Sequence, residues 1–340
     1  MLTAIGLFLL GLVLLALGGD SIVKGALGLS QRLGLTQFNA GLLLVAFATS
    51  LPELAVNLVA ILHGQSELAL GNAVGSNVAN VGLTLGAAAL AAPIVVRWRA
   101  LSPLLIVLVL GTIAVLALGA DGTLSRVEGM VLLLAYAACF AFALARSRHE
   151  SAEVREEVAG YARTSTMLGQ NLIRLGIGAV MAWIGSKLVV GGAGVHLFGL
   201  DLSHSGAAMI GKGMGLSPVL TGLFPVAIGT ALPEVAAAIA AARRGQSDLV
   251  VGHVIGASVF NVFVIIGGMA AFSALALPMT VMAPGHFVLP LGYELLAALA
   301  FGLMLYPVLR GDLRVGRGEG ALLLVAFCVW VGFELLLAGK

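Results

Sequence analysis

A duplicated apolar segment constrains the fold of this chain more than any other feature. Residues 45–80 read VAFATSLPELAVNLVAILHGQSELALGNAVGSNVAN, and residues 226–261 read VAIGTALPEVAAAIAAARRGQSDLVVGHVIGASVFN. The offset that separates Glu53 from Glu234 recurs without a gap at every equivalent position, and it continues to Gly86 and Gly267. A fixed offset over this length predicts an internal repeat, so two structurally equivalent units are expected.

Composition identifies the chain as an integral membrane protein. Hydrophobic residues make up 60% of the 340 residues and charged residues only 10%, whereas about a quarter of a soluble domain is charged. Because backbone polar groups in lipid need internal hydrogen-bond partners, the chain is expected to form either helices or a closed barrel. Long apolar runs, in place of short alternating segments, predict helices embedded in the lipid bilayer. The net charge of +2 gives no indication of a nucleic-acid partner.

Ten apolar runs are long enough to cross a bilayer. They centre on residues 2–31, 37–62, 68–91, 102–119, 127–146, 169–192, 217–242, 249–274, 287–309 and 319–338. We therefore predict an all-α polytopic membrane protein of ten transmembrane helices, arranged as two inverted five-helix repeats. The first repeat covers 1–146, a cytoplasmic linker covers 147–168, and the second repeat covers 169–340. Residues 193–214 are expected to form an outer loop or a helix extension, to which the sequence assigns no role.

The distribution of basic residues predicts how the chain lies in the membrane. Arginines gather in alternate loops, including the segment 146–163, while the loops on the other side carry only Arg126, Lys212 and the terminal Lys340. Basic loops stay in the cytoplasm, so both termini are expected outside it, in a multi-pass plasma-membrane protein. Five helices in each half make the second half enter the membrane in the opposite sense. The predicted architecture is thus an inverted-topology repeat, which in many secondary transporters holds substrate near the membrane midplane.

Each half carries a glutamate inside an apolar run, Glu53 in the first half and Glu234 in the second. A charged group at membrane depth costs roughly 2–3 kcal/mol or more, so such residues mark function by default. A threonine lies four residues earlier in each half, at Thr49 and Thr230. One helical turn places each threonine on the same helix face as its glutamate. We therefore expect a carboxylate and a hydroxyl from each half to point the same way.

A proline directly precedes each glutamate, Pro52 in the first half and Pro233 in the second. Proline has no N–H group and clashes with the carbonyl four residues earlier, so the carbonyls of Ala48 and Gly229 are expected to lose their helical partners. Irregular backbone at membrane depth occurs only where it is buried in protein or lines a cavity. We expect a kink in each helix, with freed carbonyl oxygens close to the carboxylates.

Further oxygen donors lie beside the glutamates and in the following helices. Ser76 and Asn80 are one turn apart, Asn261 repeats Asn80, and Ser50 lies three residues before Glu53. Combined about a pseudo-twofold axis, the two halves predict a central site of carboxylates, hydroxyls, amides and carbonyls. Oxygen donors without a Cys or His pair favour a hard cation over zinc or copper. Ca²⁺ takes about six to eight oxygens, and Na⁺ can share them, so one site that binds the two ions alternately makes an antiporter.

Several of these residues also have a structural interpretation. A single glutamate could pair with Lys24 or Lys187, and the hydroxyls could bond their own backbone carbonyls. His253 stands where the first half has Asn72, and both a proton-linked role and a structural, hydrogen-bonded role are open. No Ser–His or His-x-x-x-His spacing supports an enzyme, and no cofactor is expected.

Four motifs resemble those of the Ca²⁺/cation antiporter superfamily. They are ATSLPE at 48–53, GNAVGSNVAN at 71–80, GTALPE at 229–234 and GHVIGASVFN at 252–261. The chain looks most like the prokaryotic Na⁺/Ca²⁺ exchanger branch, and its size and its ten apolar runs extend the resemblance over the whole chain. The resemblance implies that the second, third, seventh and eighth helices surround the site, and that the first and sixth form a sliding gate bundle.

The resemblance also implies a role for each matching residue. Ca²⁺ would bind between the two glutamates, with Na⁺ beside it. The implied Ca²⁺ ligands are Glu53, Glu234, Thr49, Thr230 and the backbone carbonyls near Ala46 and Ala227; the implied Na⁺ ligands are Ser50 and Ser76, with Asn80 and Asn261 at the central positions.

The second half departs from the family pattern. Ala231 replaces the second hydroxyl of the usual GTSLPE, and Ala257 and Asn261 replace the serine and aspartate of a G-S-N-x-x-D pattern. Two hydroxyls and one carboxylate are therefore missing from the Na⁺ site that the second half would form. We predict an antiporter that exchanges Ca²⁺ for Na⁺ by alternating access. The alternatives are an exchanger that couples Ca²⁺ to H⁺ or has altered cation specificity, and a membrane protein that binds ions without transporting them.

Overall fold

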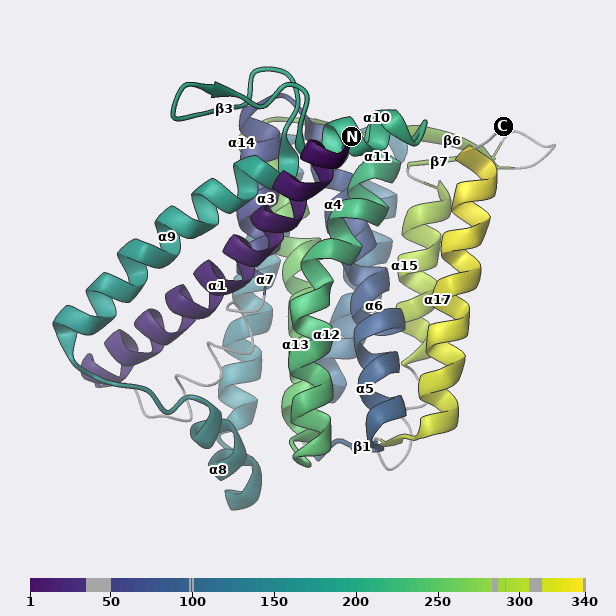
Figure 1. Ribbon diagram of the computed structural model, residues 1–340. Coiled ribbons are helices and arrows are strands. Elements are labelled where there is room, and N and C mark those ends of the chain that lie inside the picture. Colours follow the sequence, from purple (N-terminus) through teal and green to yellow (C-terminus); the bar gives the residue numbers. More distant parts are fainter. Residues whose placement is uncertain are drawn as a thin grey trace.

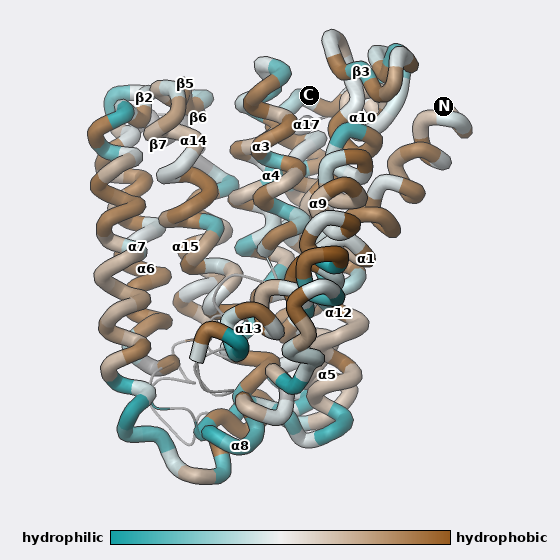
Figure 2. Tube along the Cα trace, turned by 90° about the vertical axis from the view of Figure 1, so that its left-hand side faces the viewer, coloured by the Kyte–Doolittle hydropathy of each residue, from teal (hydrophilic) through white to brown (hydrophobic). Residues whose placement is uncertain are grey.

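The computed structural model describes residues 1–34, 50–97, 99, 101–282, 287–290, 292–305 and 314–338. Within these residues, eight helices are long and apolar enough to cross a membrane. Two shorter apolar helices, Leu51–Leu62 and Tyr293–Met304, fall inside the predicted second and ninth spans. Figure 2 shows apolar residues along most of the long helices and polar residues around β2 at one end and α8 at the other. The described part of the chain is an all-helical polytopic membrane fold.

The elements follow one another in a simple order along the chain (Figure 1). The first half contains α1 (Leu2–Arg32), α3 (Leu51–Leu62), α4 (Ser66–Ala79), the π-helix η2 (Asn80–Leu85), α5 (Gly86–Ala91), β1 (Ile94–Val95), α6 (Leu101–Leu118), the 3₁₀ turn η3 (Gly119–Asp121), β2 (Thr123–Leu124) and α7 (Arg126–Ser147), and α8 (Ala152–Tyr161) follows. The second half contains α9 (Leu168–Val190), β3 (His196–Leu197), β4 (Leu200–Asp201), α10 (Gly206–Gly213), α11 (Pro218–Thr221), the π-helix η4 (Gly222–Val226), α12 (Ala227–Arg243), α13 (Ser247–Phe260), the π-helix η5 (Asn261–Ile266), α14 (Gly267–Phe272), β5 (Leu275–Ala276), β6 (Met279–Met282), β7 (Phe287–Pro290), α15 (Gly292–Met304), β8 (Arg314–Val315) and α17 (Arg317–Ala338).

The internal repeat of the sequence reappears in the boundaries of the elements. The series α4, η2, α5 and β1 begins and ends at positions equivalent, in the repeat, to those of the series α13, η5, α14 and β5. The two series finish at opposite ends of the bundle: β1 pairs with β8 near α8, while β5 pairs with β2 at the end that carries both termini (Figures 1 and 2). The complete ten-helix inverted repeat stays a prediction, because the start of the predicted second span lies in residues 35–49, outside the described residues.

Helices α1 and α9 pack as an antiparallel pair that tilts away from the other long helices (Figure 1). Glycines form the seam between them. A Cβ atom at Gly11 would lie 2.8 Å from the carbonyl oxygen of Gly185, and one at Gly18 would lie 2.9 Å from that of Gly178. Small residues allow such close backbone approach in lipid, where helix association depends on van der Waals packing. The pair therefore fits together as one unit, a feature that we did not predict from glycine spacing.

Short strands qualify the all-α prediction. The described residues include four two-stranded antiparallel pairs: β1–β8, β2–β5, β3–β4 and β6–β7. One of them corrects the predicted ninth span, because residues 287–290 form β7, opposite Met279–Met282, and α15 begins only at Gly292. Pro290 gives the reason, since the residue before a proline avoids the helical region. The predicted outer loop or helix extension at 193–214 contains the hairpin β3–β4 and helix α10.

Helix α8, which lies in the polar linker, is held next to the start of α13. The hydroxyl of Ser151 caps its start by accepting a hydrogen bond from the backbone N–H of Val154 at 3.4 Å. Arg97 makes the connection, because its guanidinium lies 3.5 Å from Glu157 while its backbone N–H donates to Asp248 at 2.6 Å. Burial and the neighbouring Asp248 raise the pKa of Glu157, and Arg97 only partly opposes them. The linker is thus docked against the bundle and is not a freely solvated segment.

Candidate ion-binding site

The repeated helices meet in the centre of the molecule. Helix α12 contacts α3, α4 and η2, and α4 in turn contacts η4 and η5. Helix α13 packs against α4 and η2. Most of these contacts join one half of the chain to the other, so the repeated motifs of the two halves lie against each other.

The two glutamates of the repeated motifs lie at this centre. Glu53 is 2% exposed and Glu234 is 7% exposed. The carboxyl groups of Glu53 and Glu234 are close enough to repel each other when both are charged, and the hydroxyl of Thr230 lies within reach of Glu53. One oxygen of Glu53 and both carboxyl oxygens of Glu234 are buried without a hydrogen-bond partner among the described residues. Buried polar atoms are nearly always hydrogen-bonded, so this pair is poised to bind a positively charged ligand.

The lysines that could have neutralised the glutamates have other partners. The ammonium group of Lys24 donates to Asp20 at 2.7 Å. Lys187 donates to the backbone carbonyl of His196 at 2.7 Å and lies 4.7 Å from the centre of the Trp183 ring. These contacts do not support the structural alternative in which a lysine pairs with an intramembrane glutamate.

Several predicted neutral ligands are also buried. Ser50, Ser76, Asn80 and Asn261 are each at most 2% exposed. Within the part of the chain that the structure describes, the hydroxyls of Ser50 and Ser76 and both amide atoms of Asn261 have no hydrogen-bond partner. These atoms can therefore act as ion ligands without first breaking a bond to that part of the protein. The predicted ligands Thr49 and Ala46 lie outside the described residues.

The hydroxyl of Thr230 bonds carbonyls of its own backbone, as the structural interpretation of the hydroxyl residues anticipated. Its Oγ1 lies 3.1 Å from the carbonyl oxygen of Val226 and 3.2 Å from that of Ala227, and it donates to this pair of carbonyls. The same group interacts with Glu53. Thr230 thus connects the carbonyl predicted as a ligand at Ala227 to the carboxylate of the other half.

The prolines are placed differently in the two halves. Pro52 lies in the first turn of α3, where a missing N–H costs nothing, and Ala48 is outside the described residues. Pro233 lies inside α12, which continues through it. Sequence reasoning missed Pro225, which lies within the π-helix η4 just before Ala227. The proline, which disturbs a regular helix, was the sequence signal that could have located this irregular segment.

Asn80 and Asn261 each open a π-helix, η2 and η5 respectively. Single π-helical turns inside α-helices occur frequently at functional sites, because the wider turn displaces the backbone from its regular ladder. Sequence reasoning singled out both asparagines but had no signal for the change of helix type. The paired π-helices distort the backbone at equivalent positions in the two repeats.

Other polar residues near the centre were not predicted as ligands. Asn72 donates a 3.0 Å hydrogen bond to Asn57. In the second half, Nε2 of His253 lies 3.3 Å from a carboxyl oxygen of Glu234, although the two atoms are not aligned as a hydrogen bond. Ser258 is fully buried, and its hydroxyl has no partner among the described residues. In the described part of the chain, no three His, Cys, Asp or Glu side chains lie close enough together to hold a metal ion, so a cation here needs neutral oxygens as well.

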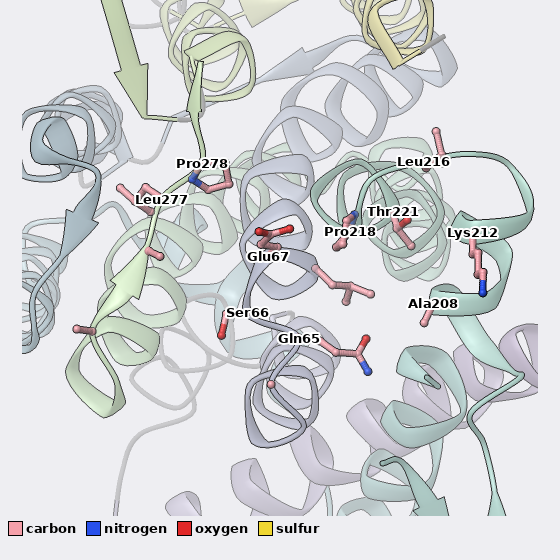
Figure 3. A pocket seen from close by; sticks show the side chains of 14 residues that line it. Gln65, Ser66, Glu67, Ala208, Lys212, Leu216, Pro218, Thr221, Leu277 and Pro278 are labelled. Atoms are coloured by element: carbon pink, nitrogen blue, oxygen red, sulfur yellow. The ribbon is translucent and has the colours of Figure 1, made fainter. Parts of the chain in front are cut away.

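A separate pocket of about 690 Å³ lies beside α10 and α11 (Figure 3). These helices are at the end of the bundle that carries the N-terminus (Figure 1). Side chains from the start of α4, from α10 and α11, and from the segment after α14 line the pocket, including Glu67 and Lys212 (Figure 3). Of the predicted ion ligands that the structure describes, none lines this pocket. Glu67 lies nine residues before Ser76 on α4, which is ~13 Å along a helix, so the pocket is separate from the predicted ligand Ser76.

A polytopic helical bundle with a buried acidic centre between two repeated helix pairs is typical of a membrane transporter of cations. The sequence profile of the sodium/calcium exchanger protein family matches residues 3–145 and 188–336. The chain belongs to this family. The resemblance inferred from the motifs is therefore confirmed, and the protein is a cation/Ca²⁺ antiporter.

Named relatives cover almost the whole chain. The inner membrane protein YrbG of Escherichia coli strain K12 is 32% identical over 97% of this chain and 96% of its own length. The putative antiporter CaxA of Alkalimonas amylolytica is 31% identical over 99% of both chains. The sodium/calcium exchanger MaX1 of Methanosarcina acetivorans is 28% identical over 96% of both chains.

A solved structure supports the same assignment. The sodium-calcium exchanger NCX_Mj, soaked with 2.5 mM Na⁺ and 10 mM Sr²⁺, superimposes with a TM-score of 0.63 at 26% identity. The match covers 97% of this chain and 98% of the other. The fold of this chain is thus the fold of a prokaryotic Na⁺/Ca²⁺ exchanger.

Proposed function

We propose that this protein exchanges Ca²⁺ for Na⁺ across the plasma membrane by alternating access. The observation that carries the proposal is the interaction of two buried carboxyl groups, Glu53 and Glu234, from the two repeated motifs. Two carboxylates with neutral oxygens around them suit Ca²⁺, which accepts flexible oxygen coordination. The names of MaX1 and NCX_Mj, both sodium/calcium exchangers, support the same pair of ions.

Each predicted ligand has a place in this scheme. In our proposal, Ca²⁺ binds between the two glutamates, and Na⁺ occupies the oxygens on either side once Ca²⁺ has left. The Ca²⁺ ligands are Glu53, Glu234, Thr49, Thr230 and the carbonyls of Ala46 and Ala227, and the Na⁺ ligands are Ser50, Ser76, Asn80 and Asn261. Bound charge neutralises the carboxylates in both loaded states, so the loaded protein can change conformation while an empty, doubly charged centre opposes it.

We further propose that α1 and α9 move together as a gate. The glycine seam keeps the two helices in register, and the pair contacts the site helices through α1 with α12 and α9 with α3. A displacement of this pair past α3 and α12 exposes the centre to one membrane face at a time. The ten-helix inverted repeat supplies the two equivalent access paths that such a cycle needs.

Gradient-driven flux tests the proposal directly. The purified chain in vesicles loaded with Na⁺ should accumulate Ca²⁺ when the outside is free of Na⁺, and uptake should stop when the Na⁺ gradient is removed. Glu53→Gln and Glu234→Gln should each lower the uptake at least about a hundredfold, because loss of one charge weakens divalent binding strongly. Glu67→Gln is the matched control, since this exposed glutamate lies in the separate pocket. Near-normal uptake by either centre variant would refute the site.

The same assay tests H⁺ as the coupling ion, because the second half lacks two hydroxyl groups that the first half has. Ala231 and Ala257, the counterparts of Ser50 and Ser76, are each 1% exposed and place methyl groups where hydroxyls would bind Na⁺. An exchanger that couples Ca²⁺ to H⁺ needs no such ligands. Ca²⁺ uptake that follows an imposed pH gradient and ignores the Na⁺ gradient would select this alternative.

A further inference from the structure

The two halves treat one equivalent position differently. In the first half, the amide of Asn72 on α4 donates to Asn57 on α3. In the second half the corresponding residues are His253 on α13 and Ala238 on α12, and the alanine offers no side-chain acceptor. The imidazole of His253 instead reaches Glu234, one helical turn before Ala238. The departure from the repeat therefore places a nitrogen donor at the carboxylate of the site.

The geometry of this contact suits two ligands of one ion. Nε2 of His253 lies 3.3 Å from Oε2 of Glu234, and the two side chains are only 14% and 8% exposed. Neither atom has a hydrogen-bond partner among the residues that the structure describes. Nitrogen and oxygen ligands each lie about 2.0–2.2 Å from a small divalent ion, so adjacent ligands at a right angle are ~3 Å apart. Two misaligned, buried donor atoms at this separation fit that arrangement better than a hydrogen bond.

We infer that His253 is a ligand of the transported cation and that it extends the substrate class from Ca²⁺ to divalent transition metals such as Mn²⁺, Co²⁺ and Zn²⁺. This inference rests on the proposed function of the same site. Ca²⁺ prefers oxygen ligands, whereas imidazole favours transition metals, with an affinity that rises from Mn²⁺ to Co²⁺. Glu234 supplies an oxygen to the same ion, and neutral oxygens complete the mixed coordination sphere around the single nitrogen.

Competition for Ca²⁺ uptake tests the inference. In vesicles containing the full chain, Mn²⁺, Co²⁺, Zn²⁺ and Sr²⁺ are compared as inhibitors of Ca²⁺ uptake. His253→Asn, which restores the residue of the first half, should weaken inhibition by Co²⁺ and Zn²⁺ about tenfold relative to Sr²⁺, with a smaller loss for Mn²⁺. His63→Asn is the control, because this histidine lies at the end of α3, where its ring contacts the carbonyl of Val59 at 2.7 Å. Its ion preferences should match those of the unmodified chain.

The outcomes separate a ligand from a positioning residue. If His253 merely held Glu234 in place, His253→Asn would change inhibition by all four ions in the same proportion, and the inference would be overturned. An unchanged order of ions would overturn it equally. His253→Gln provides a second variant of different shape should the asparagine variant not fold.

A spectroscopic measurement keeps this inference separable from the proposed function. Mn²⁺ bound to the purified chain should show electron spin-echo modulation from a directly coordinated imidazole nitrogen, and His253→Asn should abolish it. If Ca²⁺ flux ignores every ion gradient but the modulation is present, the antiport proposal fails and the ligand assignment stands. Absence of the modulation in the unmodified chain with Mn²⁺ bound refutes the ligand assignment alone.

Discussion

At the scale of single residues, the centre is built from a repeated motif whose two copies have diverged. Glu53 and Glu234 are both present and interact. The hydroxyl of Ser50 has no counterpart at Ala231, although both positions are equally buried. A buried carboxyl group is therefore kept in each half, while the neutral oxygens are concentrated in the first half.

Restoring a hydroxyl in the second half should strengthen Na⁺ binding. We expect Ala231→Ser to lower the Na⁺ concentration that gives half-maximal Ca²⁺ exchange by about fivefold, or ~1 kcal/mol, because it adds one oxygen ligand. The measurement is the Na⁺ dependence of Ca²⁺ release from loaded vesicles. Ala242→Ser, two turns beyond Glu234 on the same helix, is the control and should leave this dependence unchanged. An identical response from the two serine variants would contradict the expected role of position 231.

At the scale of elements, the sequence predicts what periodicity and composition control. The apolar runs locate the long helices, and the constant offset between the two repeats predicts the matched boundaries of α4 and α13. The strand at Phe287–Pro290 was missed because an apolar run alone does not distinguish helix from strand. The π-helices at Asn80 and Asn261 were missed because their extra residue per turn depends on packing against other helices and has no local sequence signal.

The candidate site was predictable to a similar extent. Buried charge and repetition are sufficient to select Glu53 and Glu234. The contact of His253 with Glu234 was not predicted, because it depends on how α13 packs against α12 and on the small side chain at Ala238. By contrast, the bonds of the Thr230 hydroxyl to the carbonyls of Val226 and Ala227 are local, and they were among the alternatives that the sequence left open. Pairwise contacts across helices are set by tertiary packing and are not encoded in spacing along one helix.

Docking of the linker helix α8 should depend on pH through Glu157. Burial and Asp248 raise the pKa of this carboxyl above its ordinary value of 4.5 despite Arg97. A raised folded-state pKa means that the contribution to docking is complete below pH 4.5 and is lost as the pH rises through the folded-state value. Amide hydrogen exchange of residues 152–161, corrected for its intrinsic pH dependence, should therefore show protection falling as the pH rises.

Glu157→Gln should remove most of that pH dependence and raise the protection of α8 at neutral pH by about twofold to threefold, a small effect because Arg97 partly offsets the burial of the carboxyl group. Glu153→Gln is the control, since Glu153 contacts the same Arg97 from an exposed position at 3.2 Å. Faster exchange of α8 in the Glu157 variant would show that the contact with Arg97 outweighs burial.

At the scale of the whole molecule, the structure separates the basic loops from the termini. The β1–β8 pair, α8 and the end of α12 lie at one end, and both termini and α10 lie at the other (Figure 1). The arginines at 146–163 and Arg97 belong to the first end. Because basic segments remain in the cytoplasm, this arrangement is consistent with our prediction that the termini lie outside it.

Accessibility of single cysteines tests this orientation. In a chain with Cys139 and Cys328 replaced by alanine, His204→Cys should react with a membrane-impermeant maleimide added to intact cells. Glu156→Cys on α8 should react only after the membrane is opened. Neither position is buried in the structure, so the difference reports sidedness and not burial. The opposite labelling pattern would show that the chain is inserted the other way round.

The unequal halves have a consequence for the resting behaviour of the protein. In a perfectly duplicated chain, exchanging the conformations of the two halves yields the outward-facing and inward-facing forms with the same free energy. Here Asn57 and Asn72 bond to each other in one half, while Ala238 and His253 stand in the other. The two forms therefore contain different contacts, and we expect the ion-free protein to populate one of them preferentially. Its empty site would then be open mainly to one side of the membrane.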